Sequence, residues 1–224
     1  MKRKRAEMRA KLVKQAELLI DELLDWNDET TALGLTQIED IGLKLRQQMG
    51  EQLALTGVDA QTNAKDGGKA EMVGIAAVRV RDGQIVAEYH TRVKPRVAIT
   101  SGAFATHGIS EDDVANAPHF EAMWPEFQKF CGVDILVAHN GNICDFPILR
   151  RMAAKLSGGT EFSTYDTLPL ARTLHATSRR LEHLAKRYGI ATGQSHHALD
   201  DCRTLAKLFP ALSETKLEYA RKTA

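Results

Sequence analysis

Two short stretches decide the fold that this sequence predicts. Residues 137–149 read VAHNGNICDFPIL, and residues 196–203 read HHALDDCR. Asp145 lies six residues after the histidine of the first stretch, and Asp201 lies five residues after the first histidine of the second. An acid at the start of a helix is usually only an N-cap, so the two motifs in this order carry more weight together than either does alone.

The two stretches resemble motifs II and III of the DEDDh 3′→5′ exonucleases, the family of the proofreading subunit of bacterial replicative polymerases. The resemblance covers residues 56–210. It implies an α/β, ribonuclease H-like exonuclease fold, in which helices flank a mixed central sheet. It also implies metal-dependent removal of nucleotides from a DNA or RNA 3′ end, with Asp145 and Asp201 as metal ligands and His196 as the general base.

Phosphodiester hydrolysis explains why such a family gathers acids. The reaction needs an activated water and neutralisation of charge on the leaving oxygen, and two divalent cations about 3.5–4 Å apart supply both. Hard cations such as Mg²⁺ or Mn²⁺ are held by carboxylate oxygens, and a nearby histidine can take the proton of the water. We therefore expect one of these two ions as the cofactor.

Three further positions fit the same resemblance. His107 lies in the stretch 105–109, which resembles the loop that borders the nucleotide pocket, and Asn140 follows the histidine of motif II. Both are expected to contact the substrate. Asp166 opens a stretch that is structural in the family.

The first family motif, Asp-x-Glu-Thr-Thr-Gly on a strand, is the one that the sequence does not show where it is expected. Aligning residues 56–59 with the tail of that motif puts Gln52 in place of its Asp and Ala54 in place of its Glu. A second register, far upstream, keeps Glu29 but has Asn27 at the Asp position. Residues 50–55 are interpreted as the end of a helix and residues 56–69 as a loop.

Glu29 and Asp59 are the candidate substitutes for the missing motif, although Asp59 lies off the expected strand position. Two close dications repel one another, and each carboxylate lost removes a charge that offsets this repulsion. With Asp145 and Asp201 alone, the site is expected to hold one metal ion weakly.

Periodicity divides the chain into three parts: a helical hairpin at 1–55, an exonuclease-like domain at 56–213 and a tail at 214–224. A capping box at Thr36–Glu39 would start the second helix of the hairpin. In the domain, strands are expected at 72–80, 85–93, 134–138 and 162–165. Helices are expected near 110 and at 145–156, after 166, at 181–188 and at 198–209, ending at Pro210, and a further helix carries the apolar face of Phe120, Trp124, Phe127 and Phe130.

Composition narrows the class of protein. The net charge of +1 favours no partner, but basic residues crowd the first fifteen positions. No apolar run reaches the length of a membrane span and no signal-peptide core follows the basic start, so we expect a cytoplasmic protein without a membrane partner. The three cysteines form no metal-binding spacing and are expected to be small buried hydrophobes.

Three functions stay open on the sequence alone. The chain is an exonuclease whose first motif is rebuilt from other acids, or it is a degenerate member that binds nucleic acid or a protein without cutting. In the third, the N-terminal hairpin is a docking element for a protein partner and the exonuclease fold is its scaffold.

Overall fold

The computed structural model describes residues 55–64, 69–81, 83–156, 162–194 and 197–223. The chain divides into two units, Met1–Leu53 and Ala54–Ala224, and the account below concerns the second. The predicted hairpin at 1–55, its capping box, Gln52, Ala54, Glu29 and His196 lie outside the described residues.

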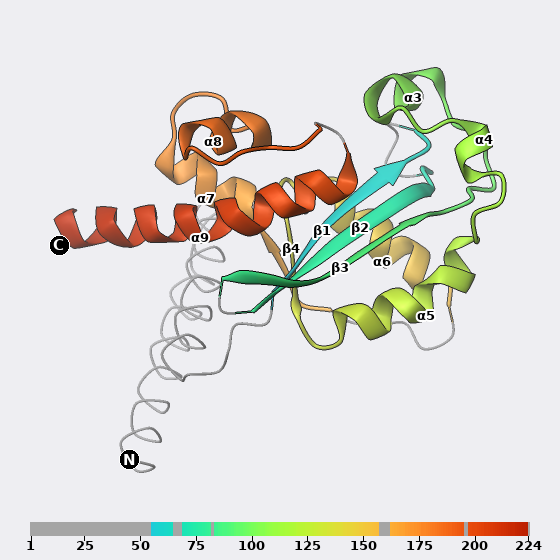
Figure 1. Cartoon of the computed structure of the whole chain (residues 1–224), viewed down its shortest axis with the longest axis horizontal. Coiled ribbons are helices and arrows are strands. Elements are labelled where there is room, and N and C mark those ends of the chain that lie inside the picture. Colours follow the sequence, from blue (N-terminus) through green and yellow to red (C-terminus); the bar gives the residue numbers. More distant parts are fainter. Residues whose placement is uncertain (1–54, 65–68, 82, 157–161, 195–196, 224) are drawn as a thin grey trace, which may run out of the picture. The chain divides into compact units, whose positions relative to one another are not determined.

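The second unit is built around a five-stranded mixed sheet (Figure 1). In spatial order its strands are β3(Gln84–Arg92), β2(Met72–Arg81), β1(Leu55–Thr62), β4(Ile135–Ala138) and β5(Thr164–Asp166). β2 pairs antiparallel with both β3 and β1, whereas β4 runs parallel to β1, and β5 parallel to β4. The predicted α/β class and all four predicted strands are confirmed.

Strand β1 corrects the interpretation of 56–69 as a loop. Glycine, aspartate and glutamine are poor strand formers, and the stretch LTGVDAQT contains all three. Pairing with β2 on one side and β4 on the other makes it a strand nonetheless. Gly57 permits the close approach, since a Cβ there would lie 3.3 Å from Cγ2 of Val78. The strand that should carry the first family motif is therefore present, and it lies later in the chain than expected.

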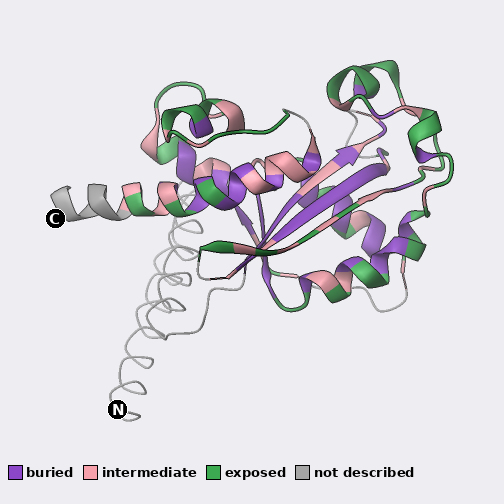
Figure 2. Ribbon diagram, viewed as in Figure 1, coloured by how far each residue is buried: buried purple, intermediate pink, exposed green. Residues whose placement is uncertain are grey.

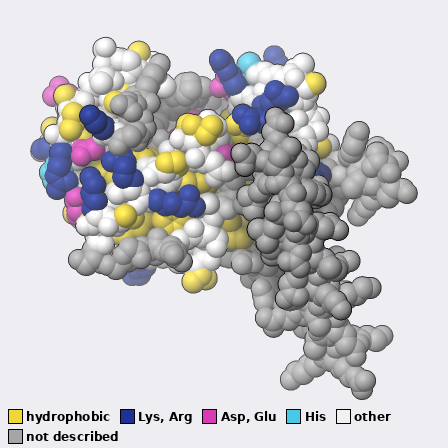
Figure 3. Space-filling view, turned by 180° about the vertical axis from the view of Figure 1, so that it is seen from behind, with side chains coloured by type: hydrophobic (Ala, Val, Ile, Leu, Met, Phe, Trp, Pro, Cys, Tyr) yellow, Lys and Arg dark blue, Asp and Glu magenta, His cyan; other side chains and the backbone are white. Residues whose placement is uncertain are grey.

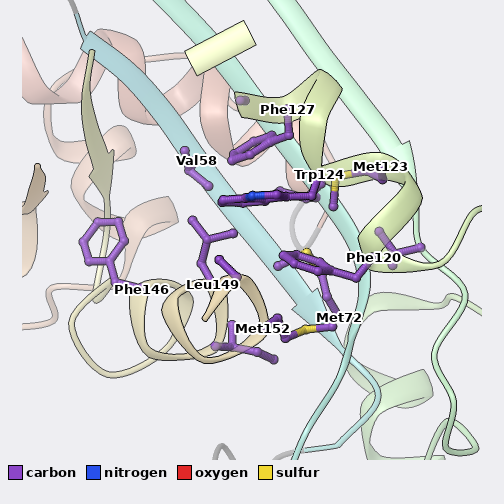
Figure 4. Packing of buried hydrophobic residues seen from close by; sticks show 14 of the residues in the cluster. Val58, Met72, Phe120, Met123, Trp124, Phe127, Phe146, Leu149 and Met152 are labelled. Carbon is purple, nitrogen blue, oxygen red and sulfur yellow. The ribbon is translucent and has the colours of Figure 1, made fainter. Parts of the chain in front are cut away.

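One face of the sheet is covered by two helices, α5(Phe120–Cys131) and α6(Asp145–Ala153). Figure 4 shows Phe120, Trp124 and Phe127 of α5 packed against Val58 and against side chains of α6. These are buried hydrophobic residues, as the sequence predicted, whereas Phe130 is only half-buried. Removing such aromatic surface from water is the main force that holds α5 on the sheet.

The opposite face is crossed by α9(Ala198–Thr223), which packs on β1 and β2. The helices α7(Thr167–Leu174) and α8(Leu181–Arg187) lie against α9. The predicted end of this helix at Pro210 is wrong. Proline removes a backbone donor from a helix, but Pro210 is on the exposed side of α9, and the buried Phe209 and Leu212 hold the helix against the domain before and after it. Figure 2 shows that α9 has both buried and exposed residues along its length.

The connection from β3 to α5 holds two short helices, α3(Ser101–His107) and α4(Glu111–Val114). The predicted loop at 105–109 is therefore wrong at its start, where α3 includes His107. Thr100 caps α3 by accepting from the amide of Ala103, and Gly108 ends it with a φ of 70°. Ser110 forms a capping box with Asp113 at α4, which agrees with the predicted helix start.

Two remaining predictions have clear outcomes. Cys131 and Cys202 are buried as expected, whereas Cys144 is exposed. Among the helices that the structure describes, none is long and apolar enough to cross a membrane.

Candidate active site

Three aspartates from three different elements face one hollow of the molecule. Asp59 lies on β1, Asp145 is the first residue of α6, and Asp201 lies in the first turn of α9. Two cavities of about 590 and 710 Å³ have Asp59, Asp201 and His139 in both their walls, and the larger also has Asp145. Asp145 and Asp201 of the two sequence motifs thus meet in space, and β1 adds Asp59, which the sequence offered as one of two substitutes for the missing first motif.

The alternation of a β-strand explains how Asp59 reaches the hollow. Successive side chains of a strand point to opposite faces, and Val58 points into the core with Trp124. Asp59 therefore points to the face that carries α9. Burial raises the pKa of Asp59 well above its usual value, and the negative charges of Asp145 and Asp201 raise it further.

Asp145 is tied directly to β1. Its Oδ1 accepts a hydrogen bond of 2.7 Å from the backbone N–H of Ala60. The carboxyl is buried, and burial raises the pKa of Asp145 to about 7; the Ala60 bond opposes this rise, and the charge of Asp166 adds to it. This bond holds the start of α6 against Ala60, the residue of β1 that follows Asp59.

The N-terminal turn of α9 is held by the residue next to Asp201. Asp200 accepts hydrogen bonds from the backbone of Gln194 at 3.1 Å and from Arg203 at 3.0 Å. Arg203 also binds Glu88 of β3 through two nitrogens, at 2.6 and 2.8 Å. A Cβ on Gly193 would lie 2.3 Å from Cγ of Asp200, so only glycine fits against this carboxylate. Asp200 thereby binds Gln194 to the first turn of α9.

The predicted base His196 lies outside the described residues, but its surroundings are fixed on both sides. Gln194 is bound to Asp200 as described, and the backbone N–H of His197 donates to the carbonyl of Gln194 at 3.2 Å. The carbonyl of His197 in turn accepts from the amide of Asp201 at 3.0 Å. Gln194 and His197 are therefore both hydrogen-bonded to the first turn of α9.

The two predicted substrate contacts lie at the cavity walls. His107 lines the larger cavity, and Asn140 lines the smaller. Nδ1 of His107 accepts from the amide of Ile109 at 3.0 Å, so its Nε2 carries the hydrogen and donates to the carbonyl of Thr62 at 3.1 Å. His107 thus joins α3 to the end of β1. Asn140 has a φ of 66°, and its backbone N–H donates to Asp166 at 2.8 Å.

Asp166 is structural, as the sequence predicted. It caps α7 by accepting from the amide of Leu168 at 2.9 Å, and it also accepts from the amides of Asn140 and Asn142. His139 is equally integrated: Nδ1 lies 2.8 Å from Oγ1 of Thr167, and Nε2 lies 2.7 Å from the carbonyl of Arg179. Burial lowers the pKa of His139, which favours a neutral, structural ring.

Sequence reasoning missed several residues of the cavity walls, among them Gln61, Arg179 and Arg180. Gln61 lines the larger cavity, and Arg179 and Arg180 line the smaller one beside Asp59 and Asp201. Figure 3 shows Lys and Arg side chains gathered at the upper right, over the region of α8. The pair of arginines just before a short helix was a usable signal, because two adjacent cations near an acidic cleft suit a phosphate chain.

The donors of the hollow fit a hard divalent cation in kind. Burial raises the pKa of Asp59 and of Asp145, and the negative charges of Asp145 and Asp201 add to the rise at Asp59. Carboxylates gathered in this way form a place where a cation would be stabilised. Across the described parts of the chain, however, no group of three or more His, Cys, Asp or Glu side chains is arranged as a complete metal site. The carboxylates would have to turn toward an ion to bind it together.

Comparison with known proteins agrees with this geometry. A family model described as "Exonuclease" matches residues 55–209. A PolC-type DNA polymerase III of Thermotoga petrophila is 36% identical over 154 residues, which are 68% of this chain and 11% of that polymerase. The chain thus spans about a tenth of the length of the curated polymerases that it matches.

Two solved structures extend the comparison. An exonuclease X in complex with 5′ overhanging duplex DNA has a TM-score of 0.59 and 30% identity, and the match covers 72% of this chain and 92% of that one. An Escherichia coli exonuclease I in complex with a dT13 oligonucleotide has a TM-score of 0.62 at 19% identity, covering 75% of this chain and 43% of that one. The second likeness shows the fold alone.

Proposed function

Because the chain belongs to the exonuclease family whose model it matches over residues 55–209, we propose that it removes nucleotides from the 3′ end of a nucleic acid with a divalent cation. One observation carries this proposal. Asp59, Asp145 and Asp201 come from three separate elements, yet all three line the larger cavity, and Asp59 and Asp201 also line the smaller one. A purely structural acid would be paired with a cation or cap a helix, and three such acids would not be gathered at one place.

In this proposal the three aspartates hold Mg²⁺ or Mn²⁺. Bound there, the metal would lower the pKa of the attacking water and neutralise charge on the leaving oxygen. His196 takes the proton of that water. The next residue, His197, accepts at its carbonyl a hydrogen bond from the amide of Asp201 at 3.0 Å, which supports this assignment.

Arg179 and Arg180 are the residues proposed to bind the backbone of the nucleic acid. Both line the smaller cavity with Asp59 and Asp201, and the side chain of Arg180 is 77% exposed. Arginine binds phosphate oxygens through two parallel hydrogen bonds. We assign these residues to the phosphates next to the 3′ terminus. DNA is the proposed substrate, since the relatives are named as DNA polymerases and a DNA-bound exonuclease.

The test is a degradation assay with a 5′-labelled single strand and Mg²⁺ or Mn²⁺. Wild type should shorten the strand stepwise from its 3′ end, and EDTA should stop this. Asp145→Asn and His196→Ala should each abolish shortening. Asp112→Asn is the matched control, since this exposed acid of α4 lies outside both cavities, and it should leave the rate unchanged.

Two outcomes would contradict the proposal. Release of the label as a mononucleotide would mean digestion from the 5′ end. Binding of the strand without shortening at any metal concentration would favour a module that binds nucleic acid without cutting it.

A further inference from the structure

The residue two positions after Asp59 is a glutamine. The stretch Asp59–Thr62 reads DAQT, whereas the family motif on this strand is Asp-x-Glu-Thr. Residues 59 and 61 of one strand lie on the same face, and both line the larger cavity with Asp145 and Asp201. β1 therefore presents a neutral amide where the family presents a fourth carboxylate.

The surroundings of Gln61 add a positive charge to that side of the cavity. Gln61 is buried, and its Oε1 accepts a hydrogen bond of 3.4 Å from Nη1 of Arg92 on β3. Gly74 makes room for the pair, because a Cβ there would lie 3.2 Å from Oε1 of Gln61 and 3.4 Å from Nη1 of Arg92. The one atom of Gln61 that could ligate a cation is thus directed toward a guanidinium.

The charges of the site follow from these contacts. Asp59, Asp145 and Asp201 line the larger cavity, and the amide of Gln61 takes the place of a fourth carboxylate. The guanidinium of Arg92 is bound to that amide. Two dications a few ångströms apart repel strongly, and the number of carboxylate charges around them sets how tightly the second is held. We propose, on the basis of the proposed function above, that the Gln61–Arg92 pair limits this site to one firmly bound divalent cation and leaves a second one weakly bound.

The experiment titrates metal-free full-length protein with Mn²⁺ and counts unbound ion by its EPR signal, without nucleic acid. Wild type should bind one Mn²⁺ firmly. Gln61→Glu should bind a second ion at least ~10-fold more tightly than wild type does, because a fourth carboxylate enters the cavity. The same variant should show the broadened EPR signal of two neighbouring Mn²⁺ ions.

Two further variants separate charge from ligation. Gln61→Ala should leave the affinity of the first ion within about 3-fold of wild type, since the amide contributes no charge. Arg92→Gln should tighten the second ion by roughly 3-fold, and the double variant with Gln61→Glu should bind it most tightly. Arg92→Gln tests the idea even if Gln61→Glu does not fold, and a thermal melt in EDTA reports folding for each variant.

Several results would overturn the inference. Equal binding of two Mn²⁺ ions by wild type would do so, as would Gln61→Glu and Arg92→Gln titrations that match wild type. Loss of the first ion in Gln61→Ala would identify Gln61 as a ligand in its own right. Failure of the proposed function is distinguishable, because no variant would then shorten a strand at saturating Mn²⁺ while the titrations still followed the predicted order.

Discussion

The two ends of strand β1 treat buried carboxylates in opposite ways. Near its start, Thr56 donates a 2.8 Å hydrogen bond to the buried Asp134, which also lies 2.7 Å from Arg81 and 3.6 Å from Arg79. Near its end, Asp59 and Asp145 face one another and Asp201, and negative charges are the neighbours that raise the pKa of Asp59. One end compensates its acid with cations, and the other gathers acids around a cavity.

This difference separates stability from function along a single strand. A buried charge costs free energy unless it is paired. At the Asp134 end that cost is offset within the protein. At the Asp59 end, in the proposed function, a cation bound from solution would offset it.

The largest expected effect is on catalysis at the Asp59 end. Asp59→Asn or Asp145→Asn should lower the rate of strand shortening by at least ~10³-fold, because each removes charge that holds the metal, worth several kcal/mol of transition-state stabilisation. Rates on a labelled strand under single-turnover conditions measure this. A rate within tenfold of wild type for Asp59→Asn would remove β1 from the active site.

Replacement of Asp134, at the other end of β1, should act on stability instead. Asp134→Ala leaves Arg79 and Arg81 without their carboxylate partner; their side chains are 28% and 27% exposed. The substitution should lower the free energy of unfolding by about 3 kcal/mol, the low end for a broken buried pair. Urea unfolding followed by circular dichroism provides the measurement. If Asp134→Ala folds and is as stable as the control Asp112→Asn, the contacts of Asp134 contribute nothing to the stability of the domain.

A pH series sharpens the comparison, since the pKa of Asp145 is raised to about 7 in the folded chain. Because the folded pKa is raised, protonation of Asp145 stabilises the native state. This stabilisation is complete below the unfolded pKa and is lost as the pH rises toward 7. Wild type in EDTA should therefore lose stability relative to Asp145→Asn, on the order of 1 kcal/mol per pH unit from about pH 4 to 7. Saturating Mn²⁺ should restore it. If the melting temperatures of wild type and Asp145→Asn change equally with pH across this range, the idea that the charge of Asp145 is uncompensated is wrong.

The smallest expected effect concerns the rim of the smaller cavity. The double variant Arg179→Ala and Arg180→Ala should raise KM for a DNA strand by about 10-fold and flatten its salt dependence, because two phosphate contacts are lost. Lys186→Ala and Arg187→Ala on the last turn of α8 form the matched control, with the same loss of charge away from the cavity lining. An equal effect of both pairs would indicate general attraction rather than contacts at these sites.

The motif residues were the part of the site that the sequence predicted best. The offsets of Asp145 and Asp201 from their histidines are local features, and local spacing survives folding unchanged. Asp59 was recognised only as a substitute off the strand, because Gly57 and Gln61 give β1 a weak strand signal and its pairing partners come from distant parts of the chain. The revised site therefore has three acids where the sequence predicted two.

Features that depend on burial were also beyond the sequence. The passage of α9 through Pro210 depends on which side of the helix meets water. The left-handed conformation of Asn140 and the hydrogen bonds of His139 and His107 to backbone depend on contacts between distant segments. Such contacts are set by the assembled fold and leave little local trace.

The hydrogen bond from Ala60 to Asp145 depends on the register in which β1 pairs with its neighbours. A slip of one residue would turn the carboxylate of Asp59 toward Trp124 and Phe127 and would present Val58 to the solvent-filled hollow. Charge in that aromatic layer is so unfavourable that the misaligned chain should not persist. The carboxylate of Asp59, which lowers the stability of the folded protein, thus also disfavours the wrong register of its own strand.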